Sequence, residues 1–518
     1  MANIFEDTDR RVIPNWRSFG KSVVLGELNS FQKEKTHTID DYSIDEYIID
    51  WKVNNTIIHA SDLLSAAIIN DKKENTEVKN AAKFILNNKN KSTFSQVSLA
   101  ERILSKKSDI DLSTLINQVT LDNLPTFIKI NSIQLKIKET KRSLSLYPYN
   151  PILYVELSRY YSILGQEKSS INAMKIAIHL GANNRFILRS ATRLFVHYNN
   201  TDNEYLDYIH SILKKSPLTI LDPWLLSAEI SIATMRSRSS RFIKKGLSLI
   251  NSNNISPFNF TELASSLGTI ELLNGSNKKS KILFNKALIS PNDNSLAQVE
   301  WASKKDLNIN IDLNKFNVQM NYEAITLDSY HNSNYDNALQ NAAKWFIDMP
   351  FSIKPILFGS NLASTILKDH KKSISFLNAG LVSHPNDPQL INNLAYAFSM
   401  DNRPDEALLE LNKVKNHKIG DSTKACLTAT KGLAYFRSGL PEQGRRLYLD
   451  AIEQTNSSKN KNLNWIAILN YAREEIILKS EFVEPIMNAV NKIPDNYKNI
   501  EINVLKNDII KEYKKLKE

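Results

Sequence analysis

Cysteine, glycine and long apolar runs are scarce in this sequence, and each scarcity excludes a class of protein. The 518 residues contain one cysteine, Cys426, so no disulfide can form within the chain and a cysteine-based zinc site is disfavoured. Only 13 glycines occur, which favours helices over sheets. No run of about 18 apolar residues predicts a membrane-spanning helix. We therefore expect a helical protein in a reducing, cytoplasmic compartment.

Length and charge set wider bounds. A chain of 518 residues is too long for one compact core, so it forms several domains or an elongated array. Lysines and arginines total 66 against 55 aspartates and glutamates, which gives a net charge of +11. Spread over this length, the charge permits an acidic or nucleic-acid partner without requiring one. Frequent Asn, Lys and Ile are typical of an AT-rich genome and lead us to expect a bacterial source.

Residues 388–414 have the pattern of two short helices that touch through small side chains. Apolar residues recur at helical spacing on both sides of a polar turn, SMDNRP. They are Ile391, Leu394, Ala395 and Phe398 before the turn and Ala407, Leu411 and Val414 after it. Ala395 and Ala407 are the positions at which we expect the two helices to cross closely.

The same pattern returns along the chain at nearly constant spacing. Segments that begin at 319, 354, 388 and 425 are 35, 34 and 37 residues apart, and others begin at 151 and 261. Segments 185–217 and 222–257 match more loosely. Matching residues include Leu157, Tyr161, Gly165 and Ala177 in the 151 segment, Gly268, Gly275, Phe284 and Ala287 in the 261 segment, and Gly432, Gly439, Tyr448 and Ala451 in the 425 segment. Because chance does not keep such a period, the repeat is an architectural signal.

In this repeat the sequence resembles the tetratricopeptide repeat (TPR) family, whose unit has about 34 residues. The resemblance covers roughly residues 141–480. It implies an all-α fold, a TPR-like α-solenoid in which helical hairpins stack into a right-handed superhelix. Since one hairpin cannot bury its own apolar face, stability is then a sum over neighbouring repeats.

The remaining composition suggests where the array begins, breaks and ends. The segment 303–318 interrupts the helical pattern, and the last residues form a polar helix of the kind that caps an array. We expect six regions: an N-terminal arm (1–40), a helical region with divergent repeats (41–140), a first TPR-like block (141–302), a break (303–318), a second TPR-like block (319–492) and a C-terminal capping helix (493–518).

A search for catalytic and metal-binding patterns finds none. No glycine-rich loop is followed by a Lys-Ser/Thr pair at phosphate-binding spacing. The nine histidines are scattered, and none pairs at the spacing of a metal site. We expect no catalytic residue, no metal ligand and no cofactor, and therefore a protein that is not an enzyme.

Two short segments carry charge or aromatic residues that suggest binding. The densest basic stretch could bind phosphates or could simply be a solvated helix and turn. The arm has aromatic and basic residues typical of interface anchors, although the arm could also fold back on its own chain. The basic residues are Arg236, Arg238, Arg241, Lys244 and Lys245, and the arm anchors are Trp16, Arg17 and Phe19.

The family resemblance implies a binding groove on the concave face, lined by the first helix of each repeat. Carried onto this sequence, the lining is mostly apolar and suits an amphipathic helix or an extended apolar segment. It has few of the Lys, Arg and Asn residues with which some family members clamp a terminal carboxylate. The predicted lining is Phe358, Leu362, Ile366, Asn392, Tyr396, Met400, Leu433, Phe436 and Arg437. The alternatives are that these residues are core and that the chain's own C-terminal helix fills the groove.

The function predicted from these patterns is a non-enzymatic scaffold or adaptor that binds a segment of another protein. One alternative is a non-catalytic sensor or regulatory subunit of a bacterial multi-protein system, such as a defence system. The other is a nucleic-acid-associated regulator that uses the basic stretch. All three rest on the fold and on the lack of catalytic motifs.

Overall fold

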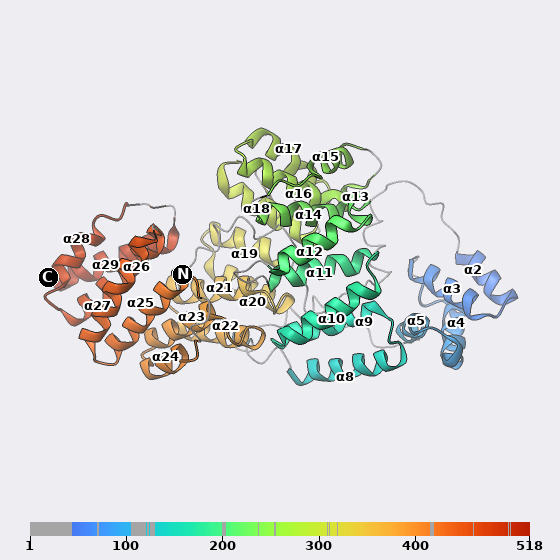
Figure 1. The fold of residues 1–518 in the computed structure, drawn as a ribbon, viewed down its shortest axis with the longest axis horizontal. Coiled ribbons are helices and arrows are strands. Elements are labelled where there is room, and N and C mark those ends of the chain that lie inside the picture. Colours follow the sequence, from blue (N-terminus) through green and yellow to red (C-terminus); the bar gives the residue numbers. More distant parts are fainter. Residues whose placement is uncertain are drawn as a thin grey trace. The chain divides into compact units, whose positions relative to one another are not determined.

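The structure is a computed structural model that describes most of residues 44–518 (Figure 1). The predicted arm, 1–40, with Trp16, Arg17 and Phe19, lies outside the described residues. The chain divides into two compact units, of which the smaller contains helices α2 to α5 and the larger contains most of α8 and all of α9 to α29. Gaps within the described part are at 70–71, 105–120, 122–123, 125–129, 199–203, 237, 253–254, 308, 310, 317, 319, 415–418, 459, 496 and 498.

The smaller unit packs four helices around Trp51. The Trp51 ring meets the Phe84 ring edge to face at 5.1 Å between centroids. Thr93 and Gln96 exchange side-chain and backbone hydrogen bonds at the start of the last helix, as their spacing predicts for a capping box. The elements are α2 (Ile44–Val53), α3 (Ile57–Ile69), α4 (Thr76–Asn87), a 3-10 turn (Lys89–Lys91) and α5 (Phe94–Leu104).

In the larger unit, α8 (Ile130–Leu146) precedes a series of helical hairpins, and no strand occurs among the described residues. We call the two helices of each hairpin its first and second helix. The first helices are α9 (Pro151–Ile163), α11 (Arg185–His197), α14 (Pro223–Met235), α16 (Pro257–Leu273), α18 (Asp293–Ala302), α19 (Tyr322–His331), α21 (Ile353–Asn361), α23 (Pro388–Met400), α25 (Asp421–Arg437) and α27 (Lys461–Leu478).

The second helices return alongside the first. They are α10 (Glu167–Leu180), α12 (Glu204–Lys215), α15 (Ile243–Asn251), α17 (Asn277–Ala287), α20 (Tyr335–Asp348), α22 (His370–Ser383), α24 (Pro404–Leu411), α26 (Pro441–Ser457) and α28 (Val483–Val490). The remaining elements are α13 (Leu218–Leu221), two π-helical turns, η2 (Ser303–Leu307) and η4 (Leu362–Ile366), the 3-10 turn η3 (Leu313–Lys315), and α29 (Ile500–Lys517). No described helix is long and apolar enough to cross a membrane.

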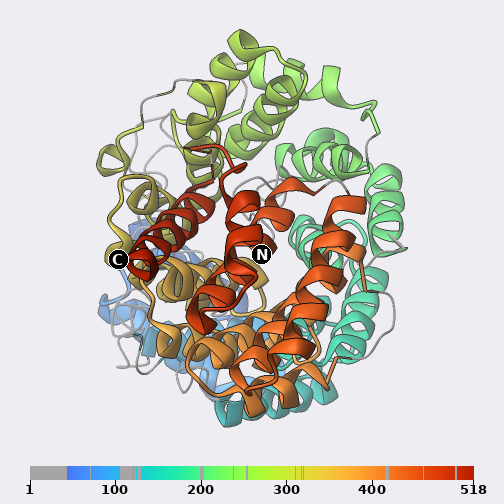
Figure 2. The same cartoon turned by 90° about the vertical axis from the view of Figure 1, so that its left-hand side faces the viewer.

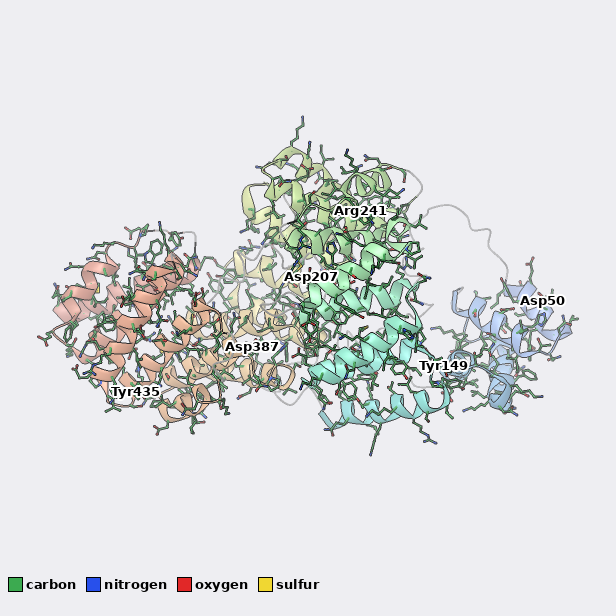
Figure 3. The ribbon with its side chains drawn as sticks, in the orientation of Figure 1. Asp50, Tyr149, Asp207, Arg241, Asp387 and Tyr435 are labelled. Atoms are coloured by element: carbon green, nitrogen blue, oxygen red, sulfur yellow. The ribbon has the colours of Figure 1, made fainter. Side chains whose placement is uncertain are left out.

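Several first helices begin at an Asn-Pro or Asp-Pro pair. Asp387 is an example: its carboxylate accepts hydrogen bonds at 2.9 Å from the backbone N–H groups of Gln389 and Leu390, and Pro388 takes the first helical position (Figure 3). Asp222 accepts two such bonds before α14, and the side chain of Asn150 accepts one, from the backbone N–H of Ile152, before α9. These caps satisfy backbone donors that would otherwise lack partners, and the proline has the φ angle that the first turn needs.

The two helices of a hairpin touch where the sequence predicts small residues. A Cβ atom on Gly432 would lie 2.9 Å from the carbonyl oxygen of Gly444, so neither position leaves room for a side chain. The hydroxyl of Ser280 donates to the Gly268 carbonyl oxygen at 2.8 Å in the 261 repeat. Ser158 and Ser170 make the equivalent contact in α9 and α10. The paired helices therefore approach each other closely in these three repeats, and Ala395 and Ala407, the crossing positions predicted for the 388 repeat, are both fully buried.

The turn between the two helices has a fixed backbone geometry. It places one residue in the left-handed region, which favours glycine because other residues clash with their own backbone. The residue falls at the same position of each repeat, fourteen after the predicted start. In repeats that start at 151, 261, 319, 354, 388 and 425 it is Gly165 (φ 66), Gly275 (φ 77), Ser333 (φ 58), Lys368 (φ 58), Asn402 (φ 61) and Gly439 (φ 76). The shared position fixes the register of these six repeats, including the 354 repeat.

The predicted break at 303–318 lacks an α-helix among its described residues. The π-helical turn η2 and the 3-10 turn η3 stand where a second helix would follow α18. The stacking of first helices nevertheless continues, because α18 packs on α16 before the break and on α19 after it. We use the term first block for α9–α18 and second block for α19–α28.

The two blocks also touch at residues far apart in sequence. The hydroxyl of Ser383, at the end of α22, donates to the carbonyl oxygen of Ile163, at the end of α9, at 2.8 Å. A Cβ atom on Gly165 would lie 2.8 Å from Cδ of Pro385. The first hairpin of the first block thus packs on the 354 repeat of the second block.

Candidate binding site on the first helices of the second block

The last helix, α29, packs against first helices of the second block. It contacts α27 and η4, and in Figure 2 it is the dark red helix that ends at the C mark. The amide of Asn361 donates to Glu501 at 3.3 Å, and the ammonium of Lys368 lies 2.7 Å from the Asp508 carboxylate. The two contacts are seven residues apart on both segments and in the same chain direction, so α29 runs parallel to the end of the 354 repeat's first helix.

The buried face of α29 carries an apolar stripe beside the buried Glu501 and Lys506, and the opposite face is charged. Ile502, Leu505 and Ile509 are spaced three and four residues apart and are at most 6% exposed. Lysines lie exposed on the opposite side of the helix. The helix therefore has the amphipathic pattern that the sequence predicts for a ligand of this block.

The apolar face of α29 belongs to a hydrophobic cluster that includes residues of the first helices α23, α25 and α27 and of the second helices α26 and α28, and within this cluster α29 packs mainly on α27. We call the cluster members on the three first helices the α29 seat. They are Tyr396 and Met400 on α23, Ala429, Leu433 and Phe436 on α25, and Trp465, Ile466, Ile468, Leu469, Tyr471, Ala472 and Ile476 on α27. The second block thus already holds an amphipathic helix.

A cavity of about 60 Å³ remains between the seat and α29. Asn392, Tyr396 and Cys426 line it from the first helices, and Glu501 and Leu505 line it from α29. Two of its acceptors, Oδ1 of Asn392 and Oε1 of Glu501, are buried and have no hydrogen-bond partner among the described residues. An unpaired buried acceptor is unfavourable because it has lost its water without replacement.

Charged and hydroxyl groups surround the cluster that forms the seat. Glu474 pairs with both Arg437, at 2.9 Å, and Arg473, at 2.8 Å. The Tyr396 hydroxyl donates to the amide oxygen of Asn470 at 3.1 Å. Burial raises the pKa of the Tyr448 hydroxyl well above its ordinary value, so this ring is neutral. Ion pairs and hydrogen bonds therefore lie at the edge of the apolar cluster.

The nine predicted groove residues divide by burial. Tyr396, Met400, Leu433 and Phe436 belong to the cluster that holds α29, and Asn392 lines the cavity. Side chains buried in the core are Phe358, Leu362, Asn392, Leu433 and Phe436, and half-buried ones are Ile366, Tyr396, Met400 and Arg437. Their role in binding a partner stays a prediction. Sequence reasoning left open whether the C-terminal helix occupies this place, and the spacing of its apolar residues was the available signal.

A carboxylate neutralises part of the predicted basic patch. Asp207 on α12 lies 2.9 Å from Arg236 and 3.9 Å from Arg238. Figure 3 marks Asp207 together with Arg241, whose guanidinium donates to the carbonyl oxygen of Lys214 at 3.3 Å. The exposed cations of the patch are Arg238, Arg241, Lys244 and Lys245.

One buried group of residues has the composition of a hydrolase triad but not its geometry. Glu229 stands between His210, at 3.1 Å, and Ser240, whose hydroxyl donates to the other carboxylate oxygen. No contact joins Ser240 to His210 here, whereas a nucleophile needs its base within hydrogen-bond reach. Among the described residues, no three or more His, Cys, Asp or Glu are grouped in a way that could hold a metal ion.

No protein-family profile and no curated protein matches the sequence. Among solved structures, it resembles the "APC/C hetero-tetramer Cut9-Hcn1" with a TM-score of 0.28 and 11% identity, over 94% of this chain and 99% of that one. It also resembles "Naa15/Naa10 bound to HypK-THB" with a TM-score of 0.24 and 13% identity, over 95% and 84%. TM-scores this low do not establish a shared fold, so the fold is assigned from the geometry of the repeats.

That geometry is the recurring left-handed turn residue together with the close contact of each helix pair. The larger unit is a TPR-like α-solenoid. In a solenoid each repeat packs on its neighbours, and the first helices lie side by side. Residues of these helices that do not pack within their own hairpin can vary from repeat to repeat. The α29 seat includes such positions, although Phe436 also packs against α26 in its own hairpin.

Proposed function

We propose that this TPR-like chain is a non-catalytic scaffold that binds a segment of another protein on the first helices of its second block. One observation carries the proposal: these helices already hold an amphipathic helix, α29, through an apolar cluster with polar contacts around it. A helix laid in a groove is one of the recurring modes of peptide recognition, and it is read through apolar anchors three and four residues apart.

The proposal is tested by photo-crosslinking in the native host. A photoreactive amino acid replaces Met400, a half-buried residue of the α29 seat, and in a matched variant it replaces Leu409, which is 64% exposed on the second helix α24. We expect one protein to crosslink from position 400 and not from position 409. Equal crosslinking from both positions, or crosslinking from 409 alone, would contradict a binding site on the first helices.

The identity of the crosslinked protein decides a narrower question. An ATPase or nuclease would support the alternative that the chain is a sensor or regulatory subunit of a bacterial multi-protein system. A protein without such activity would support a general adaptor. Both readings use the same face of the second block.

Nucleic-acid binding is the second candidate function. The exposed Arg241, Lys244 and Lys245 favour it, because adjacent cations bind phosphates. Its test is fluorescence anisotropy with a labelled duplex DNA and a labelled single-stranded RNA at about 50 and 200 mM salt. If the patch binds, replacing the three residues by glutamate removes the binding and its salt dependence. If wild type and variant bind alike, the patch is a solvated surface.

A further inference from the structure

We infer that α29 stands in for the partner's own binding segment, which is an amphipathic helix that carries a larger side chain where α29 has Leu505. This inference rests on the proposed function and narrows it to one kind of partner. The partner helix displaces α29 from its seat and takes over its contacts.

The contacts of α29 define what the partner helix needs. Three apolar residues at the spacing of Ile502, Leu505 and Ile509 fill the apolar part of the seat. Lys368 attracts a carboxylate at the position of Asp508, since it lies 2.7 Å from that group. Both charges are about half exposed, so the pair sets the direction and register of the helix more than its affinity.

The fit of α29 is incomplete at one place, which makes it replaceable. The cavity of about 60 Å³ lies next to Leu505, and no side chain of α29 fills it. Oδ1 of Asn392 faces no donor among the described residues. A phenylalanine or tyrosine at the Leu505 position would fill this space, and a tyrosine hydroxyl could donate to Asn392. A helix with such a residue therefore binds the seat more tightly than α29 does.

The short connection to α28 explains why α29 occupies the seat in the free protein. Residues 491–499 join the two helices, and Lys506 fastens α29 to this connection through the Ile493 carbonyl oxygen and the Asp495 carboxylate, both at 2.5 Å. A tethered segment competes at an effective concentration on the order of millimolar. A partner helix must therefore bind the seat more tightly than α29 does, and a side chain that fills the cavity would provide this extra affinity.

The test uses the full chain and a fluorescein-labelled peptide of residues 499–518 as the probe. In one variant, Ile502→Asp, Leu505→Asp and Ile509→Asp undock α29. In a matched control, Asn507→Asp, Lys511→Asp and Lys514→Asp change its exposed face. By fluorescence anisotropy, we expect the undocked variant to bind the probe at least about tenfold more tightly than wild type or the control, since the tethered competitor is gone.

A second probe tests the cavity. The peptide with Leu505→Phe should bind the undocked variant about three- to tenfold more tightly than the native peptide, because the ring fills space that leucine leaves empty. The peptide with Leu505→Asp should not bind. If the triple variant fails to fold by circular dichroism, Ile509→Asp alone replaces it in the same measurements.

Three results would overturn the inference. A folded undocked variant that binds neither peptide would show that α29 is a fixed cap. Equal affinity for the native and Leu505→Phe peptides would show that the cavity does not select. A dimer of the native chain by light scattering that becomes a monomer in the undocked variant would show that copies exchange α29 between them. None of these results decides the crosslinking from Met400, so the two proposals fail separately.

Discussion

The two blocks share one hairpin geometry but join their first helices by different chemistry. In the first block these helices meet through neutral polar groups: the hydroxyls of Ser227 and Ser266 lie 2.7 Å apart, and Gln298 donates to Thr269 at 2.7 Å. Where an ion pair occurs there, amides support it. Glu262, which Arg189 approaches to 2.7 Å, also accepts hydrogen bonds from Asn292 and Asn294.

In the second block, arginine–glutamate pairs and aromatic rings replace those groups. Between the first helices α25 and α27, Arg437 lies 2.9 Å from Glu474, and the rings of Phe436 and Tyr471 lie 6.2 Å apart. The second helix α26 adds to these contacts: Arg445 donates two hydrogen bonds, at 2.7 and 3.0 Å, to Glu475 of α27, which is fully buried. This block also carries the apolar seat and its helix. The comparison shows that the turn and the small residues at the close contact are similar in both blocks, whereas the residues that join one repeat to the next differ.

The largest expected effect breaks the charge pairing of the second block. Arg445→Ala leaves Glu475 buried without its main partner, and we expect the free energy of unfolding to fall by about 3–5 kcal/mol. In the first block, Arg189→Ala should lower the free energy of unfolding by about 1–2 kcal/mol, because the amides of Asn292 and Asn294 still donate hydrogen bonds to Glu262. Urea unfolding of both variants measures the difference. Equal losses would show that the amides of the first block do not compensate.

The acid dependence of the same pair has a definite sign. Burial opposes ionisation of Glu475, but hydrogen bonds from Arg445 and Ser480 hold its pKa below the ordinary 4.5. A lowered pKa gives stability that is present above the unfolded value and is lost as the pH falls through the folded one. The difference in the free energy of unfolding between wild type and Arg445→Ala should therefore become smaller when unfolding is measured below about pH 4.5.

The next effect concerns the close contact that both blocks share. In Gly444→Ala the new Cβ would lie 2.5 Å from the Phe436 ring and 2.7 Å from the Gly432 carbonyl oxygen, which forces α25 and α26 apart. We expect a loss of about 2–3 kcal/mol by thermal and urea unfolding. Gly420→Ala is the control, because nothing lies within 4 Å of its Cβ position. A similar loss at both positions would argue against crowding as the cause.

These contacts also show what the sequence could and could not predict. Small residues such as Ala395 and Gly432 are local signals, so the period and the hairpin followed from the pattern alone. Phe358 and Leu362 read as groove lining, yet they are buried, because one face of a first helix meets its own partner helix and the next face meets the neighbouring repeat. Which apolar stripe remains for a ligand depends on the packing of successive repeats, and no single repeat encodes that.

The fourth prediction concerns the pH dependence of a buried carboxyl group where the two blocks join. Glu300 lies on α18, at the end of the first block. It is 1% exposed, and burial raises its pKa to about 7. A raised pKa gives stability that is present below the unfolded value, 4.5, and is lost as the pH rises through about 7. Glu300→Gln removes this loss, so we expect it to stabilise the protein by on the order of 2 kcal/mol at pH 8 and by little at pH 4.5.

The measurement for Glu300 is thermal unfolding of wild type and Glu300→Gln from pH 4.5 to 8. Lys304, 3.6 Å from the carboxylate, favours its ionised form, but burial and the nearby charge of Asp328 outweigh it. The curves should therefore diverge between pH 5 and 8. Parallel curves, or a variant that is less stable at pH 8, would mean that Lys304 outweighs burial and that the carboxylate is charged throughout this range.

The smallest effect tests the contact between the blocks themselves. The last carbonyl groups of a helix such as α9 lack hydrogen-bond donors within the helix. The Ser383 hydroxyl donates to one of them, the carbonyl oxygen of Ile163. Ser383→Ala should cost about 1 kcal/mol and should increase hydrogen exchange at the ends of α9 and α22 together. Ser457→Ala, which removes an exposed hydroxyl bonded only within its own helix, is the control and should change neither. If exchange rises in α22 but not in α9, the blocks are held together by the packing of Gly165 on Pro385, and the hydrogen bond contributes nothing across that contact.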